Sequence, residues 1–376
     1  MSNWWALPGP GAFIGAVQDS LERGENVVLR LPKGTPAGIK GRIELGLEAV
    51  AWRDVQAECG CDPIVTLFDE FIGDPSASLR RTPGELVKQE QFEGHVIWLS
   101  GLDDKTWRSW RAFLRVYQHE MRDVPIVRRT TFIIPLAGSH ATLDVDTDVG
   151  TAEFAWGQDY DRHDLLFLAT KLLERRRLPV LHRRLCVALV AELALWDEEL
   201  AQQLASDGQH VLMDPSAILD QIREERGWGS GEHDEHDVQS LWAAGQAAKV
   251  DGQFVRHLAS LPDALRQREV KRRIWRAQLT TCMPFIEEVR QGAVATYGRL
   301  LAPIIQGTSR QHGLFDLEIA QVAQQLQSQA EVPVQHRRLF NVLHRVRNRM
   351  AHLDIVDWGD IPGEYPANLG LDDDYR

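Results

Sequence analysis

Short apolar runs alternate with helically spaced apolar positions through the first 160 residues. Apolar runs without polar–apolar alternation indicate strands buried on both faces of a sheet, and apolar residues three or four positions apart indicate a helix. We therefore predict strands at 26–31, 63–68, 95–99, 129–136 and 152–156, and helices at 43–50 and 107–121. Because strands that alternate with helices favour right-handed crossovers, the sheet is expected to be mostly parallel. This part of the chain is predicted to be a three-layer α/β domain.

The pattern changes near residues 157–164, after which no strand signal of comparable strength follows. The rest of the chain carries apolar residues at helical spacing, punctuated by Gly and Pro. The helices that this spacing predicts are 165–173, 185–204, 216–226, 240–248, 254–261, 270–280, 285–301, 315–330 and 337–352. We therefore predict an α/β plus all-α fold: an α/β domain at 1–160, an all-helical domain at 161–358 and an acidic tail at 359–376.

Composition and charge narrow the class of protein. The 376 residues suffice for two domains, and 44% hydrophobic with 26% charged residues is the balance of an ordinary globular protein. The formal net charge of −12 argues against a uniformly basic nucleic-acid coat, although basic segments remain at 266–276 and 337–349. No apolar stretch approaches the ~20 residues that cross a bilayer, and the first residues do not resemble a signal peptide. We expect a cytoplasmic protein that does not associate with a membrane.

Cys59 and Cys61 are the one close pair among the four cysteines. A single C-G-C is too tight for a usual structural zinc site, and no second C-x-x-C or H-x-x-x-H completes one. No metal site is therefore expected, and reduced thiols fit a cytosolic protein.

The segment after the first strand carries glycines where phosphate-loop ATPases hold nucleotide. Their loop reads G-x-x-x-x-G-K-[ST], because backbone N–H groups cradle the phosphates, the lysine reaches the β and γ oxygens and the hydroxyl holds magnesium. Here Gly34, Gly38 and Lys40 are the positions that would contact nucleotide. Lys40 stands one position late with no Ser or Thr after it, and Pro36 removes a backbone donor. The loop is therefore a degenerate one.

Two acids, Asp103 and Asp104, follow the third predicted strand, HVIWL. This strand looks like a Walker B strand, whose acid approaches magnesium, but the acids lie farther from it than usual. Asp at such a position also caps a following helix. Over about residues 10–200, the order of elements resembles the core of phosphate-loop ATPases of the AAA and signal-transducing (STAND) type. The resemblance implies a degenerate nucleotide-binding fold with a sensor-like strand (TTFIIPL) and a helical extension.

A short arginine–histidine pattern lies on the last predicted helix. Residues 347–352 read R-N-R-M-A-H, which resembles the R-x4-6-H signature of HEPN (higher-eukaryote-and-prokaryote nucleotide-binding) domains, helical bundles often found in bacterial toxins and antiviral systems. The resemblance covers about residues 236–358 and carries Arg347, Asn348 and His352 over as catalytic residues. It implies RNA cleavage without metal in active members. Histidine can take the proton of the 2′-hydroxyl, and arginine can face the charged phosphate.

Helical geometry limits what one copy of this pattern can do. On an ideal helix Asn348 and His352 share a face, but Arg347 and His352 diverge by about 140°. One copy alone therefore does not aim both groups at the same phosphate, and an active site implies a homodimer or a dimer-like partner. Because the pattern is short, a HEPN-like bundle without catalysis and a chance match stay open as alternatives.

Three functions follow as hypotheses. The first is a non-catalytic regulatory or adaptor subunit of a bacterial defence system, which assembles with protein partners and needs no cofactor. The alternative is a metal-independent HEPN-type RNA endonuclease that uses Arg347 and His352. The second alternative is an ATP-driven switch, in which Lys40 and Asp103 or Asp104 hold ATP and magnesium. The combination of parts resembles bacterial conflict proteins, although a fold by itself does not fix a function.

Overall fold

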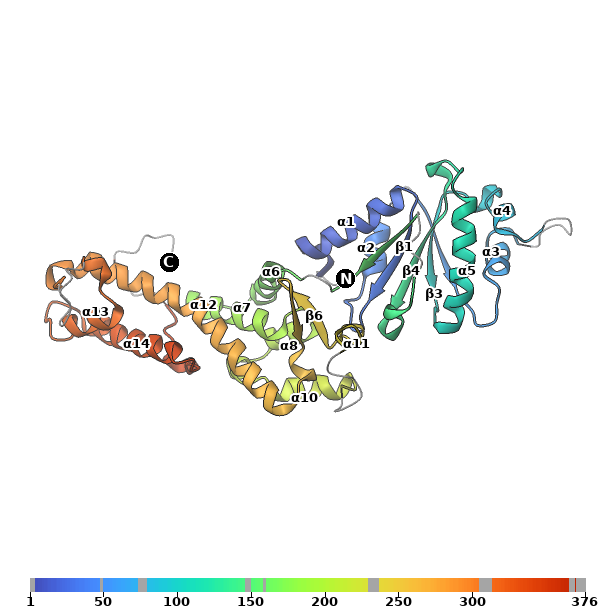
Figure 1. The fold of residues 1–376 in the computed structure, drawn as a ribbon. Helices are drawn as coiled ribbons and strands as arrows, with labels where there is room; N and C mark the ends of the chain where they lie inside the picture. The colour runs from blue at the N-terminus through green and yellow to red at the C-terminus, as the bar shows by residue number, and fades with distance from the viewer. Residues whose placement is uncertain are drawn as a thin grey trace. The chain divides into compact units, whose positions relative to one another are not determined.

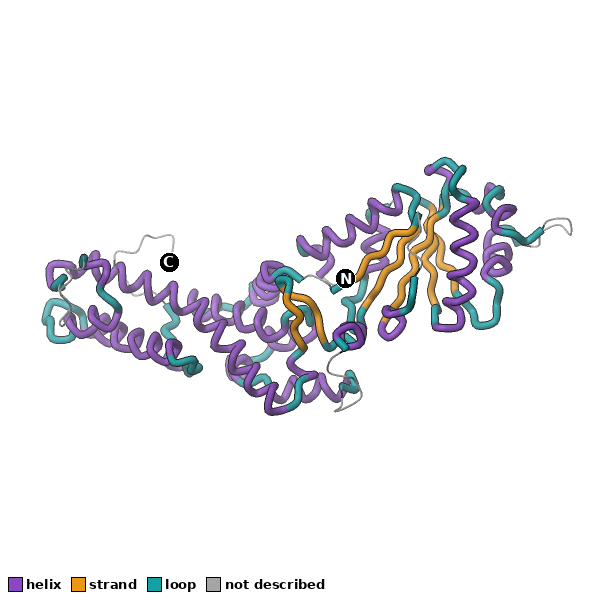
Figure 2. Tube along the Cα trace, viewed as in Figure 1, coloured by secondary structure: helices purple, strands orange, loops and turns teal. Residues whose placement is uncertain are grey.

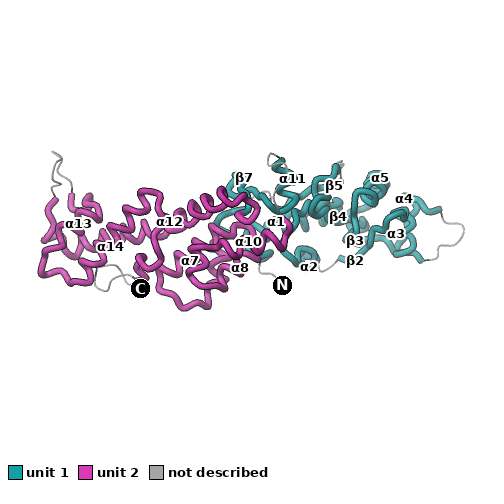
Figure 3. The backbone as a smooth tube through the Cα atoms, turned by 90° about the horizontal axis from the view of Figure 1, so that it is seen from below, with its two compact units in different colours: residues 1–164, 230–257 teal, residues 165–229, 258–376 magenta. Residues whose placement is uncertain are grey.

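The computed structural model describes residues 4–47, 50–73, 80–145, 150–157, 160–228, 237–303, 313–364 and 369. The chain folds into two compact units (Figure 3). Unit 1 comprises residues 1–164 and 230–257, and unit 2 comprises 165–229 and 258–376. Unit 1 holds a parallel sheet with helices and unit 2 is mostly helical, which confirms the predicted α/β plus all-α fold class.

The sheet of unit 1 has five parallel strands in the order β2-β3-β4-β1-β5. Its strands are β1 (Asn26–Leu31), β2 (Ala51–Gln56), β3 (His95–Ser100), β4 (Thr131–Ala137) and β5 (Thr151–Ala155). The register places Val27 of β1 between Ile133 of β4 and Ala152 of β5. β1 is buried along nearly all its length, which explains the apolar run at its residues 27–29. Four of the five predicted strands are thereby confirmed.

The strand predicted at 63–68 is wrong, because these residues begin helix α3 (Pro63–Phe71). Asp62 caps this helix by accepting a hydrogen bond from the Ile64 N–H (3.0 Å), and Pro63 stands in its first turn. The buried residues of α3 recur at helical spacing: Pro63, Ile64, Leu67 and Phe68. A short apolar run does not by itself separate a buried helix from a buried strand.

Within the five-stranded sheet, the strand that the sequence did not reveal is β2. Only Val55 among its six residues is buried, so β2 lacks the apolar run that marks β1, β3 and β4. The helix predicted at 43–50 also begins earlier than expected, as α2 (Ile39–Leu45).

Helices cover both faces of the sheet, as the three-layer prediction requires (Figure 1). α1 (Pro8–Glu22) and α2 lie on one face, and α3, α4 (Pro83–Leu86) and α5 (Asp104–Glu120) lie on the other. The α5 side holds an aromatic core in which Trp110, Phe113 and Tyr117 pack against Phe132 of β4. α5 confirms the helix predicted at 107–121.

A later part of the chain completes unit 1. α11 (Val238–Ala243) is followed by an antiparallel hairpin of β6 (Ala247–Val250) and β7 (Gln253–Arg256). The helices predicted at 240–248 and 254–261 are therefore wrong over these strands. The hairpin turn is Asp251-Gly252, with φ of 47° and 76°, and Asp-Gly is a strong sequence signal for such a turn.

Unit 2 contains no strand among its described residues (Figure 2). Its helices are the greater part of α6 (Arg162–Leu173), and α7 (Val180–Ala194), α8 (Glu198–Ser206), α9 (Gln209–Met213), α10 (Ser216–Glu225), α12 (Asp263–Tyr297), α13 (Ile319–Leu326) and α14 (Val334–Ala351). α12 packs along α7 and also contacts α13 and α14. It runs through Pro284 as one helix, where the sequence predicted two.

Candidate functional sites

The loop between β1 and α2 is the candidate nucleotide site, and two of its backbone N–H groups donate to carbonyl groups of the protein. The Lys33 N–H donates to the Ala243 carbonyl (2.8 Å), and the Thr35 N–H donates to the Pro32 carbonyl (3.1 Å). Gly34 and Gly38 have φ of 82° and 95°, so glycine is required here by the backbone conformation. The loop thus has the glycines of a phosphate loop, but two of its N–H groups already have acceptors within unit 1.

Two neighbouring segments bind this loop. The first, here called the α11 segment (residues 238–245), approaches so closely that a Cβ at Gly245 would lie 2.2 Å from the Lys33 carbonyl oxygen. The second is the Trp4–Ala6 turn, whose two tryptophans are buried and from which the Trp5 indole N–H donates to the Ala37 carbonyl (3.0 Å). Both segments therefore contact the backbone of the loop at its carbonyl groups.

Lys40 does not face the loop as a phosphate ligand would. Its Nζ pairs with both oxygens of Asp54 on β2, at 2.5 and 2.6 Å. The same Nζ lies 5.9 Å from the ring centroid of Trp98 on β3. Asp54 could not be assigned as the partner from sequence, because β2 was not recognised there. The pair keeps the lysine over the β2–β3 part of the sheet.

Asp103 caps α5, which confirms the capping interpretation. Its carboxylate accepts from the Lys105 N–H (2.9 Å) and the Thr106 N–H (2.7 Å), and its own N–H donates to the Thr106 hydroxyl (2.7 Å). The hydrogen bonds from Thr106 lower the pKa of this carboxyl. Asp104 is the first residue of α5 and is exposed. Since β4 separates β1 from β3, the loop and the two acids flank the end of β4.

The Arg–His pattern lies at the end of α14, and two of its three residues are in contact. Arg347 pairs with Glu318 at the start of α13 (3.1 Å) and also donates to the Asn348 side-chain oxygen (3.4 Å). The Asn348 amide nitrogen lies 2.8 Å from Nε2 of His344. Glu318, Arg347, Asn348 and His344 therefore form a half-exposed polar row. His344 was not singled out from sequence, although it precedes Asn348 by four residues and so shares its face.

His352 is separated from this row because it lies just beyond the last turn of α14. Its backbone N–H donates to the carbonyls of Asn348 and Arg349 (both 3.1 Å), and its side chain is exposed. The next residue, Leu353, has φ of 60° and turns the chain away from the helix. The histidine is thus available to solvent at the helix end.

The chain after His352 is hydrogen-bonded to α12. The fully buried Gln278 side chain pairs with both backbone groups of Val356, at 2.7 and 2.8 Å, and the Trp275 indole N–H donates to the Met350 carbonyl (2.8 Å). Much of the basic segment 266–276 is also paired within unit 2: Arg266–Asp220, Lys271–Asp354, Arg272–Glu269, Arg273–Glu269 and Arg276–Glu192.

The helices around the pattern differ from the expected HEPN bundle at 236–358. Residues 237–257 fold in unit 1, so the described helices of that range in unit 2 are α12, α13 and α14.

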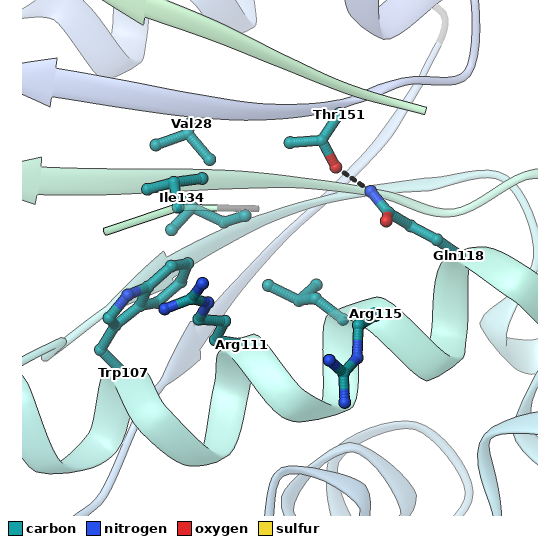
Figure 4. A pocket seen from close by; sticks show the side chains of 9 residues that line it. Val28, Trp107, Arg111, Arg115, Gln118, Ile134 and Thr151 are labelled. Atoms are coloured by element: carbon teal, nitrogen blue, oxygen red, sulfur yellow. Dashed lines mark hydrogen bonds between the residues drawn. The ribbon is translucent and has the colours of Figure 1, made fainter. Parts of the chain in front are cut away.

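A small pocket lies between α5 and the sheet (Figure 4). Val28 and Ile134 form its floor, and a hydrogen bond between Gln118 and Thr151 lies at one end of it. Arg111 of its wall pairs with Asp144 (2.9 Å). The pocket has room for about one water-sized group, too little for a nucleotide.

Among the described residues, no group of three or more His, Cys, Asp or Glu side chains could hold a metal ion. Within the same part of the chain, no helix combines the length and apolar character needed to cross a membrane. No protein-family model matches the chain, and no curated protein is significantly similar to it in sequence.

Proposed function

We propose that the chain is a non-catalytic regulatory or adaptor subunit of a bacterial defence system, which acts in the cytoplasm through protein partners. The observation that carries this proposal is that two groups which would contact phosphate, in and after the loop that follows β1, already have partners in the protein. Its Lys33 N–H is bound by Ala243 of the α11 segment, and Lys40 is bound by Asp54. A phosphate would have to displace both contacts.

The resemblance to a phosphate-loop ATPase core supports the proposal of a degenerate nucleotide-binding fold. The loop after β1 and the acids after β3 lie on the same edge of a parallel sheet, on either side of β4. Nucleotide chemistry at that edge needs a lysine on the phosphates and an acid near magnesium. Here Lys40 pairs with Asp54 and Asp103 caps α5, so both side chains already have partners within unit 1. Assembly with partners is the role that we infer for such a scaffold.

Genetic complementation with phage challenge tests the proposal. A bacterium lacking the chain is expected to regain resistance equally with the wild type, Lys40→Ala or His352→Ala, because neither side chain performs chemistry in an adaptor. Each variant is first compared with the wild type by circular dichroism and expression level. A folded Lys40→Ala that fails to restore resistance would favour the ATP-driven switch, and a folded His352→Ala that fails would favour the nuclease.

The metal-independent RNA endonuclease is the second candidate, and the polar row on α14 favours it. Arg347 and Asn348 already touch, and the row is half exposed one turn before His352. His352 would accept the proton of the 2′-hydroxyl, and Arg347, released from Glu318, would stabilise the charge that develops on the phosphate. Two copies of the row lining one cleft would bring an arginine and a histidine to the same phosphate.

Cleavage of mixed structured RNAs in the presence of EDTA tests this second function. The nuclease is expected to lose cleavage by at least about 100-fold in His352→Ala, which is the usual scale for a general base. His210→Ala is the matched control, since His210 is also an exposed histidine of unit 2 but lies outside the row. Equal rates for the wild type and His352→Ala would exclude His352 as the base.

A further inference from the structure

The turn that joins β2 to α3 carries two exposed free thiols, Cys59 and Cys61. The turn is closed by a hydrogen bond from the Cys61 N–H to the Glu58 carbonyl (3.2 Å). Gly60 between the cysteines has φ of 85°, and a Cβ there would meet nothing within 4 Å. Glycine is therefore present for the left-handed backbone, which lets the chain reverse between the two thiols.

This reversal places the two cysteines within reach of a disulfide. Residues two positions apart are separated by at most about 7 Å between Cα atoms in a fully extended chain. A disulfide needs a Cα separation of about 4.4–6.8 Å. A turned chain falls inside this range, whereas an extended chain lies at or beyond its limit. Both side chains are exposed, so an oxidant can reach either sulfur.

The other two cysteines of the described chain provide a contrast. Cys186 and Cys282 are buried, and burial raises their thiol pKa values to about 11 and about 12. Such thiols are almost wholly protonated at neutral pH and are poor nucleophiles. Thiol chemistry is therefore expected at the Glu58–Cys61 turn.

We propose that Cys59 and Cys61 form a reversible intrachain disulfide, which makes the Glu58–Cys61 turn a thiol-oxidation site. The oxidant is the disulfide of a small thiol, of which glutathione disulfide is the probe. This inference is independent of the proposed adaptor function, since it concerns residues outside both candidate sites.

Glu58 determines which of the two cysteines reacts first with glutathione disulfide. The Cys61 thiol donates a hydrogen bond to the Glu58 carboxylate (3.7 Å). Desolvation and the negative charge of this carboxylate raise the pKa of the Cys61 thiol. Cys59 therefore attacks first: its thiolate bonds to one glutathione sulfur, the glutathione S–S bond breaks, and a glutathione thiolate leaves and takes a proton. Cys61 then releases its proton to solvent, its sulfur attacks the Cys59 sulfur, and the second glutathione leaves. Two cysteine thiols are oxidised, and one glutathione disulfide is reduced to two glutathione molecules.

The resulting ring is short and solvent-exposed. Strained or exposed disulfides have higher reduction potentials than structural ones and are the labile ones. The oxidised fraction is therefore expected to follow the ratio of glutathione disulfide to glutathione in both directions.

The test incubates the full-length protein in glutathione buffers of graded ratio, blocks the remaining thiols by alkylation and locates the products by peptide mass spectrometry. The wild type is expected to lose two hydrogens within the Cys59–Cys61 peptide and to regain them in excess glutathione. Cys61→Ser is expected to keep one stable glutathione adduct on Cys59. Glu58→Gln is expected to move the pH at which the second step accelerates to a lower value.

Three results would overturn the proposal. The wild type could retain two alkylatable thiols at this turn at every ratio, it could give only disulfides between chains, or its mixed disulfide could persist as long as that of Cys61→Ser. Cys186 and Cys282 serve as internal controls, and their labelling would identify unfolded protein in a sample.

Discussion

At the residue scale, the carboxylate of Asp103 has two possible roles, an acid near magnesium or the cap of α5. Its Oδ1 accepts hydrogen bonds from two N–H groups at the start of α5, so its charge already has partners in the fold. This role could be predicted from sequence, because Asp preceding a helical apolar pattern is a common cap. The partner of Lys40 could not be predicted, since Asp54 lies on a strand with a single buried residue. The contact of His344 with Asn348 is different, because their four-residue spacing on one helix face was visible in the sequence.

Replacing Asp103 by Asn tests the capping role through its pH dependence. The folded-state pKa is lowered, so the contribution of this charge to stability is complete above the unfolded pKa of about 3.9 and is lost as the pH falls through the folded value. Asn keeps the cap but not the charge. We expect the melting temperature of Asp103→Asn to lie below that of the wild type at neutral pH, and the two to converge in acid. Asp19→Asn, at an exposed position inside α1, is the matched control.

A constant difference between Asp103→Asn and the wild type across the pH series would contradict this account, because it would mean that the charge of Asp103 does not contribute through the cap.

At the element scale, hydrophobic patterns predicted where an element lies better than whether it is a helix or a strand. β1, β3 and β4 carry apolar runs and were predicted, as was the short β5, whereas the run at 63–68 belongs to a helix. The hairpin of β6 and β7 was interpreted as helix because its strands have four residues each, too few to show a period of two. The Asp251-Gly252 turn signal was the information that could have corrected this.

The contact between the α11 segment and the loop after β1 can be tested with two glycines of similar backbone. Gly245 and Gly252 have φ of 74° and 76°, so alanine costs about 1 kcal/mol or more at either for the backbone alone. At Gly245 the new Cβ would also lie 2.2 Å from the Lys33 carbonyl oxygen, whereas at Gly252 it meets nothing within 4 Å. We expect Gly245→Ala to lower the free energy of unfolding by roughly 1–3 kcal/mol more than Gly252→Ala.

Urea denaturation followed by tryptophan fluorescence measures this difference, because Trp242 of α11 is buried in unit 1. An equal loss of unfolding free energy in the two alanine variants would show that the α11 segment is not in close contact with the loop.

At the scale of the whole molecule, the chain contributes to unit 1 twice, at 1–164 and again at 230–257. The sequence predicted the change from α/β to helical character near residue 160, but not this return. Hydrophobic periodicity reports local structure, whereas the packing of a distant segment against a loop depends on contacts such as Lys33–Ala243. The proposed adaptor function is argued from these long-range contacts, so it depends on information that local patterns do not contain.

Isothermal titration of the full-length protein with ATP and magnesium tests the central claim most directly. With the loop bound by Ala243 and Lys40 bound by Asp54, we expect no saturable heat below about 1 mM ligand, an affinity limit of about −4 kcal/mol. Lys40→Ala is expected to behave as the wild type. Saturable binding by the wild type that Lys40→Ala abolishes would contradict the account, because it would place Lys40 on the phosphates and favour the ATP-driven switch.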